Sequence, residues 1–353
     1  FGDISNETTN YVLINECLPF ADMGREEKRQ GLGPYELEGP YDKCKDLVQL
    51  KGNDREYYAR IFATIGRIAG HHKARRLASD GFIAQNLGVP PAAIGDAAAW
   101  GMDPGGNTGL ESGQCRGRLG AAVKFVSATA KQIYPEYMGE TRAQERFTKV
   151  LMTMNAYTRE VNCYKHLQYD LIALGHTNCN IDNAYFWRDE NGELDCGIFD
   201  WGGFGARCLP HSLWWCVNCS EFDQLKANLD GYIDAFIDAY HESGGPAVDH
   251  DTVRRMMLLT SFDNTQFMVA AVPNALKQCP AKEWATIKDR NDRRIADDVG
   301  DKSTLRTTLH VLNNGIRVIE EMGGEEAMDD FIQKVWVELF QQPPKSDKII
   351  FGE

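Results

Sequence analysis

The spacing of apolar side chains predicts long helices on both sides of a polar central segment. From Asn53 to Leu77, apolar residues recur three or four positions apart, which is the period of one helix face, and Asn53-Asp54 offers an N-cap. The same spacing predicts further helices over 140–166, Leu225–Tyr240, 251–278, 303–322 and 325–341. The last third of the chain is therefore expected to be helical.

Other parts of the chain lack this period. Tyr11–Ile14 is a short β-branched run that predicts a strand. Residues 24–45 are rich in glycine, proline and charge, which is typical of a surface loop. We interpret the stretch from 80 to about 140 as an insertion or a long functional loop, because its first part is rich in glycine and has no regular apolar spacing.

The central segment, Leu171–Gly202, predicts a hairpin that carries polar groups at its open end. Asn191-Gly192 between two apolar runs is a strong signal for a two-residue turn. With that turn, Asn183 faces Asp200 across the hairpin. An amide oxygen and a carboxylate side by side suit a hard divalent cation such as Mg²⁺, which takes few protein ligands and completes its shell with phosphate and water.

The same residues carry a resemblance to the protein-kinase-like superfamily, in its aminoglycoside phosphotransferase and choline kinase branch. Those families have His-Gly-Asp, four residues and Asn, followed by a hairpin that ends in Ile-Asp-Trp or a similar triplet. This chain has His176-Thr177-Asn178, four residues, Asn183 and then Phe199-Asp200-Trp201. Tyr11–Phe20 resembles the hinge between the two lobes of the family, and Ile65–His72 resembles a family helix that ends in Leu-Ala-x-x-His.

The resemblance assigns roles to individual residues. Asn183 and Asp200 would hold Mg²⁺, while Asn15, Glu16 and Cys17 would form the hinge that meets the adenine of ATP. Asn178 stands where the family has its catalytic Asp, so that it would face the acceptor without being able to take its proton. Asp182 is a candidate substitute base, and His176 is expected to brace the loop rather than act as a base.

The fold class expected from the resemblance is α+β and kinase-like. The domain division is a residual strand and hinge of the N-terminal lobe over 1–23, and an enlarged helical C-terminal lobe over 24–353 with the insertion at about 80–140. The family's strand lysine and Gly-rich loop have no counterpart in the few residues before the hinge, so the N-terminal lobe is expected to be largely absent from this chain.

Composition and charge narrow the function classes. The chain has 353 residues, with 38 Lys+Arg against 51 Asp+Glu and a net charge of −13. This acidic balance argues against nucleic acid as a partner, and no apolar run is long enough for a membrane span. The 10 cysteines are too sparse for a disulfide framework and predict buried thiols in a reducing, intracellular compartment. A soluble intracellular protein is expected, without a choice between cytoplasm and an organelle lumen.

One cysteine cluster could instead bind zinc. Cys208, His211, Cys216 and Cys219 have ligand types and short spacings that suit a tetrahedral Zn²⁺ site. Against this, only four residues separate the two pairs, and Leu213-Trp214-Trp215 between them is typical of a core-facing helix. Buried thiols are the favoured interpretation.

Two functions follow from the resemblance. The first is an ATP- and Mg²⁺-dependent phosphotransferase that acts on the hydroxyl group of a small molecule. The alternative is a catalytically inactive, pseudokinase-like protein that binds a ligand or a protein partner, or serves as a scaffold subunit of an assembly. Asn178 favours the alternative, because an amide cannot replace a general base worth about 10²–10⁴-fold in rate.

Overall fold

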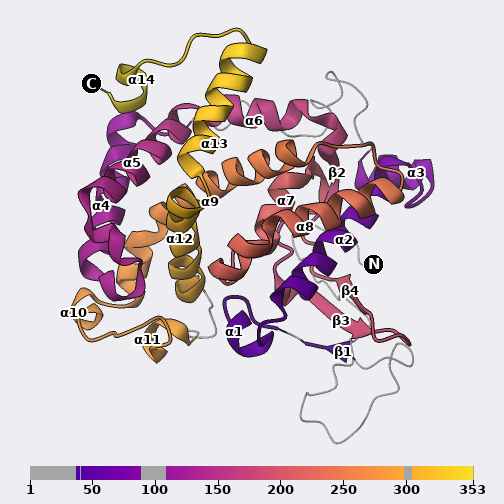
Figure 1. Ribbon diagram of the computed structural model, residues 1–353, viewed down its shortest axis with the longest axis horizontal. Helices are drawn as coiled ribbons and strands as arrows, with labels where there is room; N and C mark the ends of the chain where they lie inside the picture. The colour runs from indigo at the N-terminus through magenta and orange to yellow at the C-terminus, as the bar shows by residue number, and fades with distance from the viewer. Residues whose placement is uncertain (1–36, 40, 89–108, 298–303, 353) are drawn as a thin grey trace, which may run out of the picture.

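The computed structural model describes residues 37–39, 41–88, 109–297 and 304–352, and shows a mostly helical α+β chain with two small antiparallel sheets (Figure 1). The α+β class predicted from the sequence is thereby confirmed. The hinge candidates Asn15, Glu16 and Cys17, and the predicted strand before them, lie outside the described residues.

The helices are long where the apolar period is long. They are α1 (Asp46–Gln49), α2 (Asp54–Lys73), α3 (Asp80–Phe82), α4 (Ser112–Lys124), α5 (Thr141–Ala156), α6 (Thr158–Leu167), α7 (Leu209–Val217), α8 (Phe222–Glu242), α9 (His250–Gln278), α10 (Ala281–Trp284), α11 (Arg293–Ala296), α12 (Thr304–Glu321), α13 (Gly324–Asp330) and α14 (Asp347–Phe351). The strands are β1 (Leu37–Glu38), β2 (Ile172–Gly175), β3 (Ala184–Arg188), β4 (Leu194–Ile198) and β5 (Gly205–Cys208).

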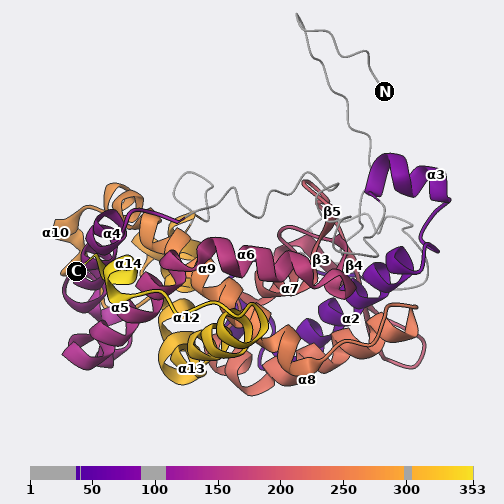
Figure 2. The same ribbon diagram turned by 90° about the horizontal axis from the view of Figure 1, so that it is seen from above.

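The helix α9 forms the centre of the core. It packs against α5, α7, α8 and α12, and its inward side is lined with fully buried apolar residues such as Met257 and Phe262. The sheets lie at one end of the molecule beside α2, whereas α4, α5, α10 and α14 form the other end (Figure 2). Among the described residues, none of the helices has the length and apolar character needed to cross a membrane.

Two strand pairings create the framework of the candidate site. The strands β1, β3 and β4 form one sheet, and β2 pairs with β5 in the other, with Gly175 opposite Gly205. Because β2 and β5 are neighbours in space but distant in sequence, their pairing brings the segment after β2 next to the segment before β5. These are the segments 176–183 and 199–204.

The hairpin forms as predicted, but its register differs by one residue. Ala184 faces Ile198, and the amide of Phe199 donates to the carbonyl of Asn183 at 3.1 Å, so Asn183 does not face Asp200. The turn has three residues instead of two, because the Asp189 carboxylate accepts from two backbone amides and Gly192 adopts a left-handed φ of 80°.

The predicted insertion over 80–140 is only partly irregular. The helix α4 forms within it because Cys115, Leu119 and Ala122 recur at helical spacing and are buried. Its glycines, including Gly113 and Gly117, have no neighbouring side chain or backbone where a Cβ would be placed. They therefore lie on the open face of the helix, which explains why the glycine-rich composition did not predict a helix here. Residues 89–108 lie outside the described part.

The helices α2 and α8 cross closely because α2 carries glycines at the contact. A Cβ on Gly66 would lie 2.6 Å from the carbonyl oxygen of Phe236, and one on Gly70 would lie 2.5 Å from that of Tyr240. Both obstacles are backbone atoms of α8, so a side chain there would force the helices apart.

We expect Gly70→Ala to lower the free energy of unfolding by about 1–3 kcal/mol through overpacking. Gly231→Ala, in α8, is the matched control: a Cβ there meets nothing within 4 Å, and better helix propensity should stabilise the chain by up to about 1 kcal/mol. Urea unfolding of the two variants checks this, and equal effects would contradict the close crossing.

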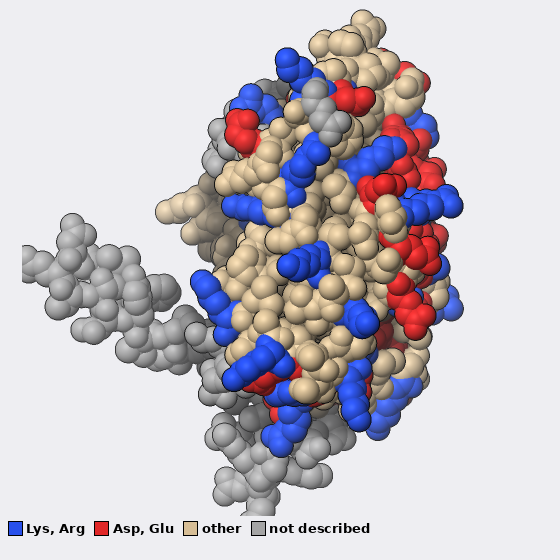
Figure 3. Space-filling view, turned by 90° about the vertical axis from the view of Figure 1, so that its left-hand side faces the viewer, with Lys and Arg blue, Asp and Glu red and all other residues tan. Residues whose placement is uncertain are grey.

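The charge of the chain is unevenly distributed. On the face that includes α4, α10 and α14, Lys and Arg side chains are scattered among uncharged residues, while Asp and Glu gather along one edge (Figure 3). This view shows no continuous strip of basic side chains.

Candidate functional site

His176, at the end of β2, holds the two loops of the site together. Its Nδ1 accepts from the backbone amide of Asn178 at 3.1 Å, so Nε2 carries the proton and donates to the carbonyl of Phe199 at 3.1 Å. Burial lowers the pKa of His176, which favours this neutral form. Both ring nitrogens are thus engaged with the backbone, and His176 is a positioning residue.

Asn183 fixes the other end of the first loop. Its Nδ2 donates to the carbonyl of Asn178 at 2.6 Å, and its backbone amide donates to the carbonyl of Asn180 at 2.8 Å. The short helical turn Ile181–Asn183 makes this possible by folding Asn183 back over the loop. With Nδ2 committed, the opposite atom of the amide, Oδ1, is the one that remains for a ligand.

Asn178 is oriented by a neighbouring amide. Its Oδ1 accepts from Nδ2 of Asn180 at 2.5 Å, and Asn180 is itself buried. The side chain is therefore held in place by hydrogen bonds within the loop, and it presents an amide where the family resemblance predicts a carboxylate.

Asp200 occupies a strained position between β4 and β5. Its φ is 58°, a left-handed value that costs free energy in a residue other than glycine and is frequent at functional sites. The backbone around it is fixed, since Thr177 Oγ1 donates to the carbonyl of Gly202 at 2.9 Å and Arg207 donates to that of Gly203 at 2.5 Å. Within the described part of the chain, the exposed Asp200 carboxylate has no hydrogen bond or ion pair.

The donor chemistry of Asn183 and Asp200 is of the kind that a magnesium ion takes. The Asn183 amide and the Asp200 carboxylate come from backbone segments that are hydrogen-bonded to each other, because Phe199 precedes Asp200. Oxygen is the ligand that Mg²⁺ prefers, and two protein ligands suffice when phosphates and water complete the shell. The described residues contain no cluster of three or more His, Cys, Asp or Glu side chains that could hold a metal without such help.

Asp182, the candidate substitute base, is engaged elsewhere. Its carboxylate forms an ion pair with Lys43 at 3.0 Å, with both side chains mostly buried. Burial, the largest single effect, lowers the pKa of Lys43, but the charge and the hydrogen bond of Asp182, with contributions from Cys219 and Cys44, together leave the pKa raised. Lys43 comes from the segment before α1, which we interpreted as a surface loop, so no pattern in the sequence pointed to this ion pair.

The zinc alternative is wrong for the four residues that suggested it. The thiol of Cys216 contacts Cys179, that of Cys219 contacts Cys44, and Nε2 of His211 accepts from the Trp215 indole at 3.1 Å. The candidates therefore have separate neighbours, and no metal cluster forms among the described residues. Buried thiols, the favoured interpretation, describe Cys208, Cys216 and Cys219.

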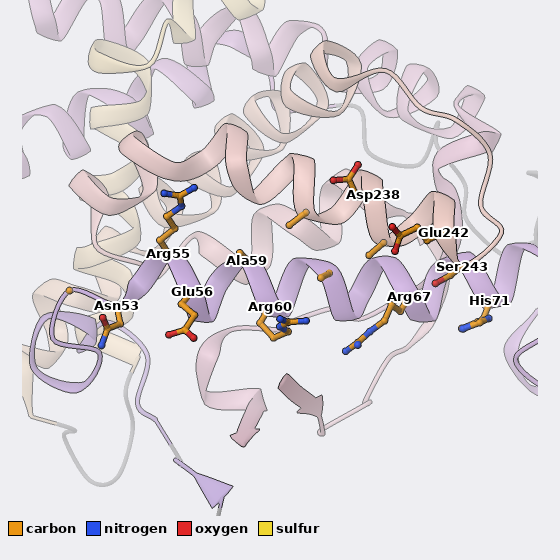
Figure 4. A pocket seen from close by; sticks show the side chains of 14 residues that line it. Asn53, Arg55, Glu56, Ala59, Arg60, Arg67, His71, Asp238, Glu242 and Ser243 are labelled. Atoms are coloured by element: carbon orange, nitrogen blue, oxygen red, sulfur yellow. The ribbon is translucent and has the colours of Figure 1, made fainter. Parts of the chain in front are cut away.

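The described residues also form a shallow groove of about 820 Å³ along α2 and α8, away from the site (Figure 4). Alanines of both helices, such as Ala59 and Ala239, line its floor. Arg60 and Arg67 project from α2 on one side, and Asp238 and Glu242 project from α8 on the other. Its charges are mixed, and it includes none of the residues that the sequence predicts for catalysis.

Comparison with known proteins adds no identity: no family model, curated protein or solved structure matches this chain.

Proposed function

We propose that this chain is a phosphotransferase-like protein that binds a magnesium-complexed nucleotide at Asn183 and Asp200. The observation that carries the proposal is the loop pair between β2 and β5: Asn183 accepts a backbone hydrogen bond from Phe199, the residue before Asp200, and Asp200 is strained, exposed and without a partner in the described residues. The family resemblance supplies the substrate class, which is ATP with a small-molecule hydroxyl as acceptor.

Each residue of the site has a distinct part in this function. A bound Mg²⁺ would supply charge neutralisation for the nucleotide phosphates. Asn183 and Asp200 would hold it, and His176 keeps the two loops in register through its two backbone hydrogen bonds. Asn178 would accept a hydrogen bond from the acceptor hydroxyl with the remaining lone pair of Oδ1.

Turnover is expected to be slow, because neither of the two candidate bases can readily take the proton of the acceptor. Asn178 is an amide, and Asp182 is paired with Lys43. Phosphoryl transfer depends mainly on positioning and charge stabilisation, so the loss of a base reduces the rate without removing the binding site.

A second candidate function is binding without catalysis, as in a pseudokinase-like protein that engages a ligand or a protein partner. The Asn178 side chain favours it, because an amide in the place of the base cannot take the proton of an acceptor. Where the bound ligand is ATP, the two candidates differ only in whether it is converted to ADP.

The test is the thermal stability of the full chain with ATP, with and without Mg²⁺. Wild type should gain about 2.7 kcal/mol of stability at a MgATP concentration 100 times its dissociation constant, and less without Mg²⁺. Asp200→Ala should abolish the Mg²⁺-dependent gain, whereas Asp238→Ala, on the exposed side of α8, should keep it. Absence of a gain in wild type would contradict the phosphotransferase and a nucleotide-binding pseudokinase, and where a gain is seen ADP release separates these two.

A further inference from the structure

Three buried polar atoms on β5 and on the two helices that contact it lack the hydrogen-bond partners that buried groups need. Lys165, on α6, is 2% exposed, and its Nζ has no partner. The Nε of Arg207, on β5, and the Oγ of Ser212, on α7, are also buried without partners. Most buried polar atoms in folded proteins are satisfied, so three such atoms on neighbouring elements need an explanation.

The elements that carry these atoms meet at β5. The strand β5 contacts both α6 and α7. Arg207 and Ser212 meet over Gly175 of β2: a Cβ there would lie 2.8 Å from Cγ of Arg207 and 2.7 Å from Oγ of Ser212. Gly175 thus leaves the space in which the Arg207 side chain lies beside Ser212.

The surroundings of the group are positive. Burial, together with the charges of Lys165, Arg207 and His166, lowers the pKa of His211 to about 3, and burial also lowers the pKa of Lys165. The nearby carboxylate is that of Asp263 on α9, which does not hydrogen-bond to Lys165. A buried ammonium group without a partner costs several kcal/mol, so the site is electrostatically incomplete as it stands.

The chemistry of the three atoms defines the missing ligand. An ammonium group, a guanidinium N–H and a hydroxyl can all donate, and the first two are positively charged. Their complement is an anion that only accepts hydrogen bonds. We propose that Lys165, Arg207 and Ser212 form a binding site for a phosphate-class oxyanion, separate from the Asn183 and Asp200 site.

Such an anion would also act on the Asp200 loop. Arg207 uses a terminal nitrogen to hold the carbonyl of Gly203, while its Nε belongs to the anion group. A ligand at Nε would fix the guanidinium plane and with it the hydrogen bond to Gly203. The site is therefore placed to order the segment that carries Asp200.

The experiment uses inorganic phosphate as the probe, without Mg²⁺ or nucleotide. Low millimolar phosphate should raise the melting temperature of the wild-type chain above that in chloride of equal ionic strength. Lys165→Met should weaken the apparent phosphate affinity by about 10- to 100-fold, as expected for loss of a charged hydrogen bond. Without phosphate, Lys165→Met should melt at or above the wild-type temperature, because it removes a buried unpartnered charge.

The controls separate this site from other effects. Lys124→Met, at an exposed position of α4, should leave the phosphate response unchanged, and Ser212→Ala should reduce it less than Lys165→Met. Asp200→Ala should retain the response, so failure of the nucleotide site would not affect this test. Equal phosphate responses in wild type and Lys165→Met, or no response in wild type, would overturn the proposal.

Discussion

An Asn178→Asp variant should release ADP from MgATP about 10²- to 10⁴-fold faster than the wild-type chain, the range that a general base contributes. The substitution exchanges an amide NH₂ for an oxygen in a side chain that is already positioned. Nδ2 of Asn180 would still donate to it, and Nδ2 of Asn183 would still hold the backbone carbonyl of residue 178. The new carboxylate should therefore occupy the place of the present amide.

Two further variants make this result specific. Asp182→Asn should leave wild-type turnover unchanged if the ion pair with Lys43 keeps Asp182 out of the reaction. Asn191→Asp, in the exposed turn of the hairpin, adds the same negative charge away from the site and should not increase the rate. Turnover can be measured with water or with amino sugars and amino alcohols as acceptors. If Asn178→Asp gains nothing while MgATP still binds, the chain belongs to the binding-only class.

The sequence predicted the helices well because their apolar period is strong. The predicted helix from Asn53 corresponds to α2, and the predicted helices near 251–278 and 303–322 correspond to α9 and α12. Over 140–166 the structure has two helices, α5 and α6, with a break at Tyr157. No glycine or proline lies at that break, so the apolar period alone could not predict it.

The sequence predicted which residues belong to the candidate site, but not how they are arranged in space. The spacing of His176, Asn178, Asn183 and Asp200 located the two loops, but the register depended on how the turn closes. The turn was set by Asp189, whose side chain accepts from backbone amides two and four residues later. Contacts that join distant segments, such as the Lys43–Asp182 ion pair, leave no local pattern in the sequence at all.

A buried acid away from the site gives the second large effect. Asp46, at the start of α1, is fully buried, and its Oδ2 accepts from the Tyr58 hydroxyl at 2.8 Å while Oδ1 has no partner. Burial raises the pKa of Asp46 from 3.8 to about 7, and the nearby carboxylates of Asp54 and Glu221 add to the increase. The folded chain therefore holds the Asp46 proton far more tightly than the unfolded chain does.

The sign of the pH dependence follows from this difference. Below pH 3.8, Asp46 is protonated in both states and does not affect stability through ionisation. Between 3.8 and about 7 the unfolded chain loses the proton while the folded chain keeps it, so stability falls as the pH rises. Above about 7 the penalty is complete, and at about 1.4 kcal/mol per pKa unit it amounts to about 4 kcal/mol.

Asp46→Asn should remove this penalty, because an amide of the same shape can still accept from Tyr58 and does not ionise. The variant should match wild type near pH 4 and exceed its free energy of unfolding by about 4 kcal/mol at pH 8, as measured by urea unfolding across that range. Effects of titrating groups that do not interact with Asp46 cancel in the difference between the two chains. Asp238→Asn, at an exposed position of α8, should show no comparable gain. A difference independent of pH would mean that Asp46 is not held protonated by the fold, whereas a gain that grows from pH 4 to 7 and then levels off requires that it is.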